Sequence, residues 1–167
     1  MTGVDASPTL AALAREAGGF DVVVDADAAS LPFPDGAFDL VCAFMSLHDV
    51  DDLGGVLAEA HRVLEPGGRL AAAIVHPFSS AHLGGADETD YCTPHRYADT
   101  FERDGLEMTF HSMHRSLEGY AAALRAAGFV LQDLREPVPS DDHVRELPEM
   151  AKSTRRPTFL HFLALRS

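Results

Sequence analysis

Apolar and polar positions in the first half of the chain form short apolar runs that alternate with helical patterns. Residues 20–26, 38–44 and 69–75 are short, continuous apolar runs bounded by turn residues, and they predict buried strands. Apolar residues recur at helical spacing over 8–17 and 53–64, which predicts two amphipathic helices. Strands without polar alternation, separated by helices, indicate a parallel sheet covered on both faces.

Helix start and stop signals set the expected boundaries. Ser7 suits the N-cap and Pro8 the first turn of the first helix, and Gly18-Gly19 ends it. The second helix is expected to start after the candidate caps at 51–52 and to stop at the turn over 66–68.

The second half of the chain has a different texture. Residues 76–103 are rich in Gly, Pro, Ser and Asp without a sustained period, which predicts a long loop or lid, with disorder as the alternative. The remaining expected elements are a strand at 106–113, a helix from Ser116 to Gly128, a strand at 129–137, a polar loop at 138–157 and a final strand at 158–167.

Length and composition indicate one domain spanning 1–167. The 167 residues (18.0 kDa) are 46% hydrophobic, and no apolar run approaches the eighteen or so residues of a membrane span. We therefore expect no membrane association. The first ten residues lack a basic start followed by an apolar stretch, so we expect no secretory signal and a cytoplasmic location.

The charge balance is strongly acidic, with 13 Lys and Arg against 26 Asp and Glu, giving a formal net charge of -13. Because nucleic-acid binding depends on basic residues that neutralise phosphates, we expect no nucleic-acid partner. Cys42 and Cys92 are too few for a disulfide scaffold. Since Cys42 lies in an apolar run, we expect it to be a buried thiol.

Parallel α/β sheets bind ligands beyond the carboxyl ends of their strands, so the residues just after each apolar run carry the most information. These residues are Asp5, Asp27, the segment 44–48 and His76.

Three segments in this order carry a family resemblance: GVDAS before a helix, VDADAASLPFPDGAFDLV, and FMSLHDVDDLGGVLAEAHRVLEPGGRL. Together they resemble the class I S-adenosylmethionine-dependent methyltransferases of the type 11-like group. The resemblance assigns them to the second strand with its acidic end, the third strand with an adenine-side turn, and the fourth strand with the next helix and the turn into the fifth strand. It continues through the C-terminal strands and covers nearly the whole chain.

The resemblance implies an α/β Rossmann-like fold: a mostly parallel sheet with helices on both faces and an antiparallel C-terminal strand. It also implies an incomplete sheet, because no GxG occurs here and the family's first strand, glycine-rich loop and first helix have no counterpart. We therefore expect the chain to be N-terminally truncated before the second strand. A start assigned too late, at an internal GTG codon read as Met1, would explain this, and the upstream genomic sequence tests it.

In the resembled sheet the first strand lies between the second and fourth strands. Its loss removes roughly five ladder bonds on each side at about 0.5–1.5 kcal/mol each, which rivals the roughly 5–15 kcal/mol stability of a domain. We therefore expect poor solubility, direct pairing of the second and fourth strands, or self-association through unpaired sheet edges.

The resemblance also assigns the cofactor, S-adenosylmethionine, to particular residues. The six cofactor-binding residues are Asp5 and Ala6 at the ribose, Asp27 and Ala28 at the adenine, and Phe44 and Met45 near the methionine portion. A capping role is the alternative for Asp5. Leu31 and Phe33 either flank the purine or belong to the core.

Methyl transfer is an in-line displacement that depends mainly on positioning, and a base is needed only for a protonated acceptor. His48 and His76 are the candidate catalytic bases, with capping or loop anchoring as the alternative. The remaining histidines and Cys92 match no zinc spacing, so we expect no metal site.

The resemblance thus implies an enzyme that transfers a methyl group from S-adenosylmethionine to a small-molecule acceptor at oxygen, nitrogen or carbon. The loops at 76–103 and 138–157 are expected to build the acceptor pocket. One alternative is a non-catalytic remnant or partner subunit. Another is a nicotinamide-dependent oxidoreductase, because an acid after the second strand also suits an adenosine ribose.

Overall fold

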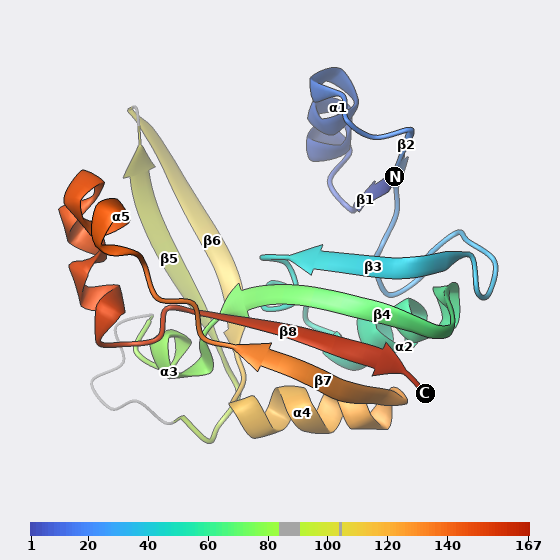
Figure 1. Ribbon diagram of the computed structural model, residues 1–167. Coiled ribbons are helices and arrows are strands. Elements are labelled where there is room, and N and C mark those ends of the chain that lie inside the picture. The colour runs from blue at the N-terminus through green and yellow to red at the C-terminus, as the bar shows by residue number, and fades with distance from the viewer. Residues whose placement is uncertain (84–90, 104) are drawn as a thin grey trace.

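A computed structural model of the chain describes residues 1–83, 91–103 and 105–167 (Figure 1). The part of the expected loop that falls on 84–90 lies outside the described residues. The elements are β1 (Thr2–Asp5), α1 (Pro8–Ala17), β2 (Val22–Asp25), β3 (Phe38–Phe44), α2 (Leu53–Val63), β4 (Leu64–Val75), α3 (Pro77–Ser80), β5 (His95–Arg103), β6 (Leu106–His114), α4 (Leu117–Ala126), β7 (Phe129–Arg135), α5 (Asp141–Glu146), a 3₁₀ helix (Pro148–Thr154) and β8 (Phe159–Arg166).

The first unit is a parallel β1–α1–β2 motif, and its helix has the predicted limits. The Ser7 side chain accepts a hydrogen bond from the Leu10 backbone N–H, and Gly18, at φ 74°, ends the helix. Leu10 and Leu13 are each 54% exposed because α1 packs mainly on β1 and β2. The apolar stripe of α1 is therefore largely uncovered in the described chain.

The second sheet has the order β3-β4-β8-β7, with β3 parallel to β4 and β8 antiparallel to both of its neighbours. The expected antiparallel C-terminal strand is confirmed. The turn expected over 66–68 lies inside β4, because the register jumps from Phe38 opposite Leu64 to Leu40 opposite Arg69. The helix α2 therefore ends at Val63, earlier than predicted.

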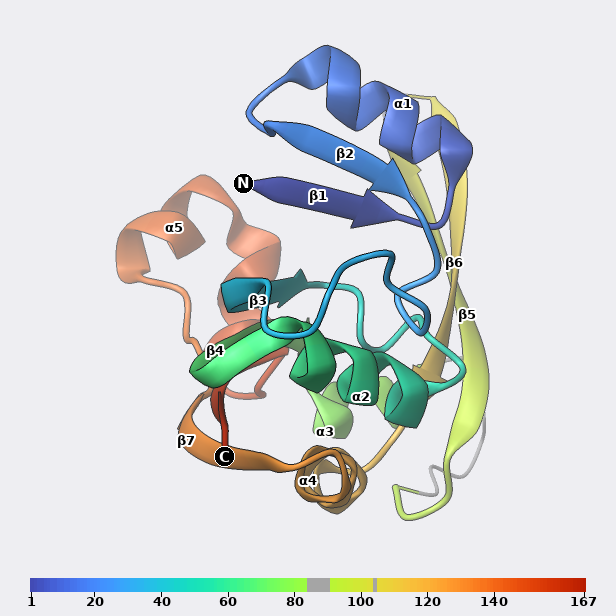
Figure 2. The ribbon, with the colours of Figure 1, turned by 90° about the vertical axis from the view of Figure 1, so that its right-hand side faces the viewer.

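The two sheets face each other through the edges of β1 and β3, which are not paired in the described structure. Figure 2 shows β1, β2 and β3 running in the same direction with a gap between β1 and β3. In the numbering of the resembled family, β1 is the second strand and β3 is the fourth. The expected lack of pairing between these two strands is confirmed, and the alternative that they pair directly is wrong. From the facing edges of β1 and β3, the β1–α1–β2 connection leads outward to one side and the β3–α2–β4 connection leads outward to the other. Because such crossovers are right-handed, α1 and α2 are expected on opposite faces of the strands.

The core lies on one face of the four-stranded sheet, beneath α2 and α4. Its fully buried members include Leu57, Leu64, Leu70, Ile74 and Leu160. The other face is not covered by the described residues, so Phe44 is 74% exposed and Cys42 is exposed. The expectations that β3 is buried on both faces and that Cys42 is a buried thiol are wrong. An open hollow of about 290 Å³ on this face is lined by residues of β3, β4, β7 and β8.

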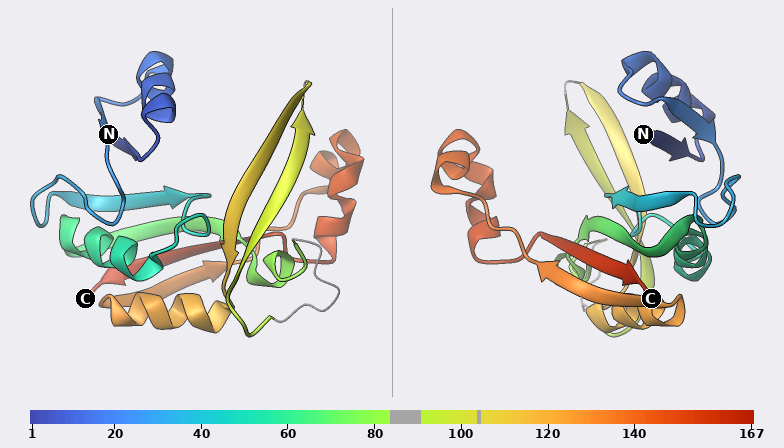
Figure 3. Two further views of the ribbon diagram at one scale, coloured as in Figure 1. Left: turned by 180° about the vertical axis from the view of Figure 1, so that it is seen from behind. Right: turned by 45° about the vertical axis from the view of Figure 1, so that its right-hand side comes forward.

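The expected loop at 76–103 is wrong for much of its length. It contains the short helix α3 and strand β5, which pairs antiparallel with β6 over the full strand. Figure 3 shows in both views that this hairpin projects from the four-stranded sheet. The residues of β5 alternate in exposure from His95 to Thr100, as expected for a strand, but the irregular composition of 76–103 concealed it.

The expected loop at 138–157 also contains short helical elements, α5 and the 3₁₀ helix. Ser140 caps α5 by accepting from the His143 N–H. No helix among the described residues is long and apolar enough to cross a membrane.

Candidate functional site

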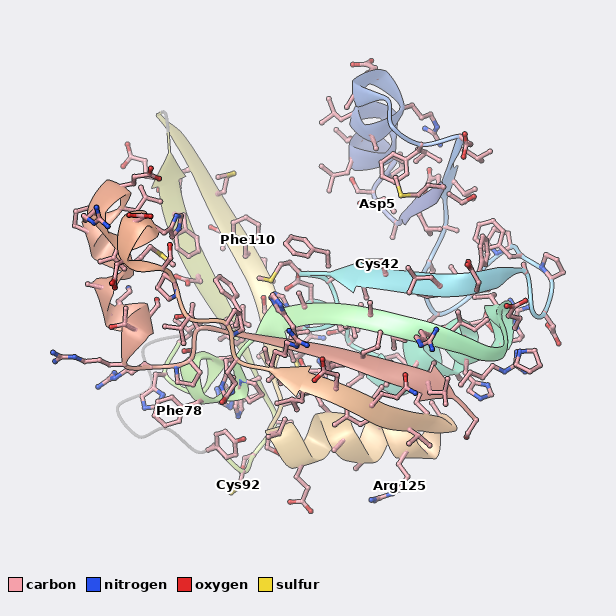
Figure 4. The ribbon with its side chains drawn as sticks, in the orientation of Figure 1. Asp5, Cys42, Phe78, Cys92, Phe110 and Arg125 are labelled. Carbon is pink, nitrogen blue, oxygen red and sulfur yellow. The ribbon has the colours of Figure 1, made fainter. Side chains whose placement is uncertain are left out.

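The first group of predicted cofactor residues comes together at the carboxyl ends of β1 and β2. Asp5 lies opposite Asp25 in the parallel register, and the Ala26 N–H donates to the Asp5 carbonyl at 3.1 Å. Asp5–Ala6 and Asp27–Ala28 therefore follow neighbouring strand ends. Figure 4 labels Asp5 at the end of the strand, on the side of the N-terminal unit that faces the second sheet.

The carboxylates of Asp5 and Asp27 each accept a backbone hydrogen bond within the turn that follows their strand. Asp5 Oδ1 accepts from the Ser7 N–H at 2.8 Å, and Asp27 Oδ1 accepts from the Ala29 N–H at 2.9 Å. The cap of α1 is Ser7, so the capping alternative for Asp5 is not the geometry observed. A carboxylate has about four acceptor positions, so each turn leaves capacity for ligand hydroxyl or amine groups.

The loop after β2 is fastened to α2 by an ion pair that sequence reasoning missed. Arg62 donates to Glu59 and to the carbonyls of Leu31 and Phe33, while Glu59 accepts from the Leu31 N–H at 2.7 Å. Hydrogen bonding to Arg62 lowers the pKa of Glu59 to about 2. The i,i+3 spacing of Glu59 and Arg62 was the available signal, but it did not identify their loop partners.

Phe33 and Ala28 contribute to packing in this loop. The Phe33 ring meets Phe38 edge-to-face at 5.1 Å between ring centroids, which agrees with the core alternative for Phe33. Ala28 packs against the core cluster under α2. The role of Leu31 beside a purine stays a prediction.

The second group of predicted residues follows the ends of β3 and β4. The Met45 N–H donates to the Ala73 carbonyl at 2.8 Å, which extends the ladder one residue past Phe44. Met45 has φ 52°, the single non-glycine residue in the left-handed region among those described. Such a conformation at a strand end lets the chain turn sharply and exposes backbone groups toward the site edge.

His48 is buried behind this strand end. It is 6% exposed, its carbonyl accepts from the Met113 N–H at 2.7 Å, and its Nε2 lies 3.5 Å from Asp49 Oδ1. Its Nδ1 is buried and has no hydrogen-bond partner in the described structure. Burial lowers the pKa of His48, the Asp49 carboxylate raises it, and the Arg115 guanidinium lowers it.

Asp49 and Arg115 are functional-site candidates that sequence reasoning missed. Ser112 on β6 donates to Asp49 Oδ1 at 2.6 Å, which links the hairpin to the loop after β3. Arg115 donates to the carbonyls of Val50 and Asp51 and so fixes the same loop. These partners are more than 60 residues apart in sequence, so no local pattern could have found them.

His76 follows β4 as predicted, and both of its ring nitrogens have partners. Nδ1 accepts from the Phe78 N–H at 3.0 Å as the N-cap of α3, and Nε2 lies 2.8 Å from Glu136 Oε1. This geometry favours the capping alternative over catalysis. His76 as a base stays a prediction.

A third histidine cluster anchors the hairpin base. His114 is fully buried, with Nδ1 2.7 Å from Ser80 Oγ and Nε2 2.9 Å from the Tyr91 carbonyl. The His95 ring lies 4.8 Å from the His114 ring. Within the described ranges, no group of three or more His, Cys, Asp or Glu residues is placed to hold a metal ion.

Known proteins resemble the chain both in sequence and in fold. The family model described as a methyltransferase domain matches residues 1–72. Demethylmenaquinone methyltransferase of Thermus thermophilus is 46% identical over 81 residues, covering 46% of this chain and 37% of that protein. The ubiquinone/menaquinone biosynthesis C-methyltransferase of Desulfotalea psychrophila is 37% identical over 122 residues, covering 62% of this chain and 44% of that protein.

A solved structure extends the match to the whole fold. An S-adenosylmethionine-dependent methyltransferase from Mesorhizobium loti matches with a TM-score of 0.75 and 25% identity, covering 99% of this chain and 79% of that one. Over residues 1–72 the chain matches the methyltransferase-domain family, and its whole fold is similar to that of an S-adenosylmethionine-dependent methyltransferase. The expected Rossmann-like α/β fold is thereby confirmed. This chain spans less than half the length of the two curated relatives named above.

Proposed function

We propose that this chain takes part in methyl transfer from S-adenosylmethionine to a small organic acceptor. The proposal rests on where the predicted residues lie. Asp5 and Asp27 lie at the carboxyl ends of the adjacent strands β1 and β2, and Met45 and His48 follow the carboxyl end of β3. Figure 2 shows these three strands running in the same direction, so their carboxyl ends lie on one side of the fold. Ligands of open α/β sheets bind at such an edge.

The donor set at this edge fits the proposed cofactor. The free acceptor positions of Asp5 suit two ribose hydroxyls, and those of Asp27 suit an exocyclic amine. The strongly acidic chain also favours a cationic ligand. When bound, S-adenosylmethionine supplies an electrophilic methyl group on a sulfonium, and the residues of this edge hold the adenosine end.

His48 is the stronger of the two candidate bases. Its lowered pKa keeps the imidazole neutral near pH 7, and its Nδ1 lone pair is not used by another described group. Both ring nitrogens of His76 already have partners. We therefore prefer His48 to His76 as the candidate base, and we assign loop anchoring to His76.

Calorimetric titration with S-adenosylmethionine tests the cofactor assignment. We expect micromolar binding, weakened about tenfold by Asp5→Asn, because hydrogen bonds to a charged group contribute roughly 1.5–3 kcal/mol. Asp39→Asn is the matched control, since Asp39 lies near the amino end of β3, away from the site edge. Equal effects of the two substitutions would contradict the assignment.

The same titration separates the alternatives. Absence of binding favours a non-catalytic remnant or partner subunit. Tighter binding of a nicotinamide cofactor than of S-adenosylmethionine favours an oxidoreductase.

We further infer that the unpaired edges of β1 and β3 promote self-association. Unpaired parallel edges present free backbone donors and acceptors, and the exposed Val22, Leu40 and Phe44 lie on the strands of these two sheets. Light scattering across a concentration series is expected to show oligomers that dissociate on dilution. A monomer at all concentrations would refute this inference.

A further inference from the structure

The β5–β6 hairpin has two chemically different faces. Residues paired across an antiparallel ladder share a face, and successive residues alternate between faces. One face, here named the inner face, carries Tyr97, Asp99, Phe101, Met108, Phe110 and Ser112. The opposite face carries Arg96, Ala98, Thr100, Glu107, Thr109 and His111. The hairpin is therefore amphipathic, and the aromatic side chains are on the inner face.

The inner face is buried at its base and open toward its tip. Ser112 and Tyr97 are 6% and 7% exposed, whereas Phe110 is 48% and Phe101 51% exposed. Figure 4 shows Phe110 on the side of the hairpin that faces β3 and the N-terminal unit. Figure 1 shows the hairpin beyond the carboxyl end of β3, with the β1–α1–β2 unit standing apart from it above β3. Through the bond from Ser112 to Asp49, the base of the inner face adjoins the loop after β3.

Two carboxylates lie on or against this face. Asp49 accepts from Ser112 at the base, and its side chain is 41% exposed, so it is accessible beside Tyr97. Asp99 is half-buried and lies opposite Phe110 in the register. Tyr97 lies opposite Ser112 in the ladder, and Ser112 donates to Asp49, so Asp49 lies at the base of this face. Burial raises the pKa of Tyr97, and the negative charges of Asp49 and Asp99 raise it further.

Two described arginines near this face, Arg115 and Arg96, have their hydrogen-bond and ion-pair partners elsewhere. Arg115 is 9% exposed and donates to backbone carbonyls of the loop after β3. Arg96 lies on the opposite face and pairs with Asp51 at 2.8 Å. Among the described side chains, the inner face therefore combines aromatic rings with two carboxylates that form no ion pair with Lys or Arg. This combination attracts organic cations through ion pairing and cation–π contact.

We propose that the inner face of the hairpin binds the methyl acceptor as a planar aromatic molecule that carries a protonated amine. This proposal rests on the proposed function, since it names the acceptor class for the same site. The ring lies against Phe110 and Met108, and the ammonium group lies at Asp49. Ser112 and Phe110 are two residues apart, roughly 7 Å along the strand, which suits a bicyclic ring with a short side chain.

Two indoles that share a ring but differ in charge test the proposal. Tryptamine is a cation and indole-3-propionate an anion at pH 7.5, and each is titrated into the full chain by calorimetry. We expect tryptamine to bind about tenfold more tightly, since a charge-assisted hydrogen bond to a carboxylate contributes roughly 1.5–3 kcal/mol. Equal binding, preference for the propionate, or no binding of either indole overturns the proposal.

Matched variants locate the site. Asp49→Asn should abolish the preference for tryptamine, and Phe110→Ser should weaken both indoles about fivefold by removing an aromatic contact. Phe78→Ser is the control, because Phe78 is 43% exposed but lies on α3, away from the inner face. Circular dichroism verifies that each variant folds. A preference that survives Asp49→Asn, or equal effects of the two phenylalanine substitutions, refutes the assignment.

A separate titration with S-adenosylmethionine distinguishes the two proposals. Cofactor binding without tryptamine preference retains the proposed function and overturns the acceptor class. Tryptamine preference without cofactor binding retains the inner face as an amine site and refutes the proposed function.

Discussion

The hydroxyl of Ser112 donates a 2.6 Å hydrogen bond to the carboxylate of Asp49 and so joins the β5–β6 hairpin to the loop after β3. The same carboxylate oxygen lies 3.5 Å from Nε2 of the buried His48. Asp49 therefore receives a fixed orientation from the hairpin and acts electrostatically on the imidazole. The protonation of His48 therefore depends, through Asp49, on Ser112, which lies 64 positions away in sequence.

Asp49→Asn is expected to lower the pKa of His48 further. The carboxylate favours the imidazolium, whereas burial and the Arg115 guanidinium oppose it, so neutralising Asp49 removes the one favourable influence. Tyr97 and Tyr120 stay neutral because burial raises their pKa, that of Tyr120 to about 12. NMR titration of the His48 ring protons measures the shift, with Asp142→Asn on α5 as control. A rise in the pKa would contradict this account.

The stability of the chain is expected to fall as the pH falls below about 6.5. His48 and His61 both have a pKa lowered by burial, so the unfolded state binds protons at a higher pH than the folded state does. Their contribution is full above the unfolded pKa of about 6.5 and is lost as the pH drops toward the folded values. Urea unfolding at pH 7.5 and pH 5.5 measures it.

The variant His48→Gln should reduce the difference between the two pH values, whereas His111→Gln, at an exposed position, should not. A pH dependence unchanged by His48→Gln would refute the role of this residue.

Local signals in the sequence predicted the elements well, because they act within a few residues. Ser7, Ser116 and Gly128 mark helix ends in the structure as they do in the pattern. Strand β3 has the predicted limits for the same reason, since an apolar run bounded by turn residues is itself a local property. These elements also place Asp5, Asp27 and Met45 at strand ends.

Burial could not be predicted from the same pattern. An apolar run shows that a strand can be covered, but which neighbour covers it depends on tertiary structure. Phe44 and Cys42 are therefore exposed despite their apolar surroundings. The contact of Asp49 with Ser112 was missed for a related reason, since it joins segments separated by more than 60 residues. The hairpin is local in sequence, but its first strand was concealed by the irregular composition of 76–103.

Glu59→Gln is expected to loosen the loop at 31–35 without unfolding α2. The substitution removes the charge that orients Arg62 and weakens the bond to the Leu31 N–H, so the melting temperature should fall by roughly 2–4 °C. The Glu59 pKa of about 2 means that this contribution is present above about pH 4.5 and is lost as the pH falls toward 2. Glu146→Gln, on the exposed surface of α5, should change neither the melting temperature nor the dependence of stability on pH.

Leu57→Ala is expected to cost about 2–5 kcal/mol of the free energy of unfolding, since Leu57 on the core face of α2 is 1% exposed and its truncation leaves a cavity. Leu13→Ala removes the same atoms from a side chain that is 54% exposed, so it should change stability by less than about 0.5 kcal/mol. Urea unfolding at low protein concentration measures both. If self-association covers α1, the cost of Leu13→Ala will rise with protein concentration while that of Leu57→Ala stays constant. Comparable costs for both leucines in the dilute monomer would show that α1 is packed differently from this structure.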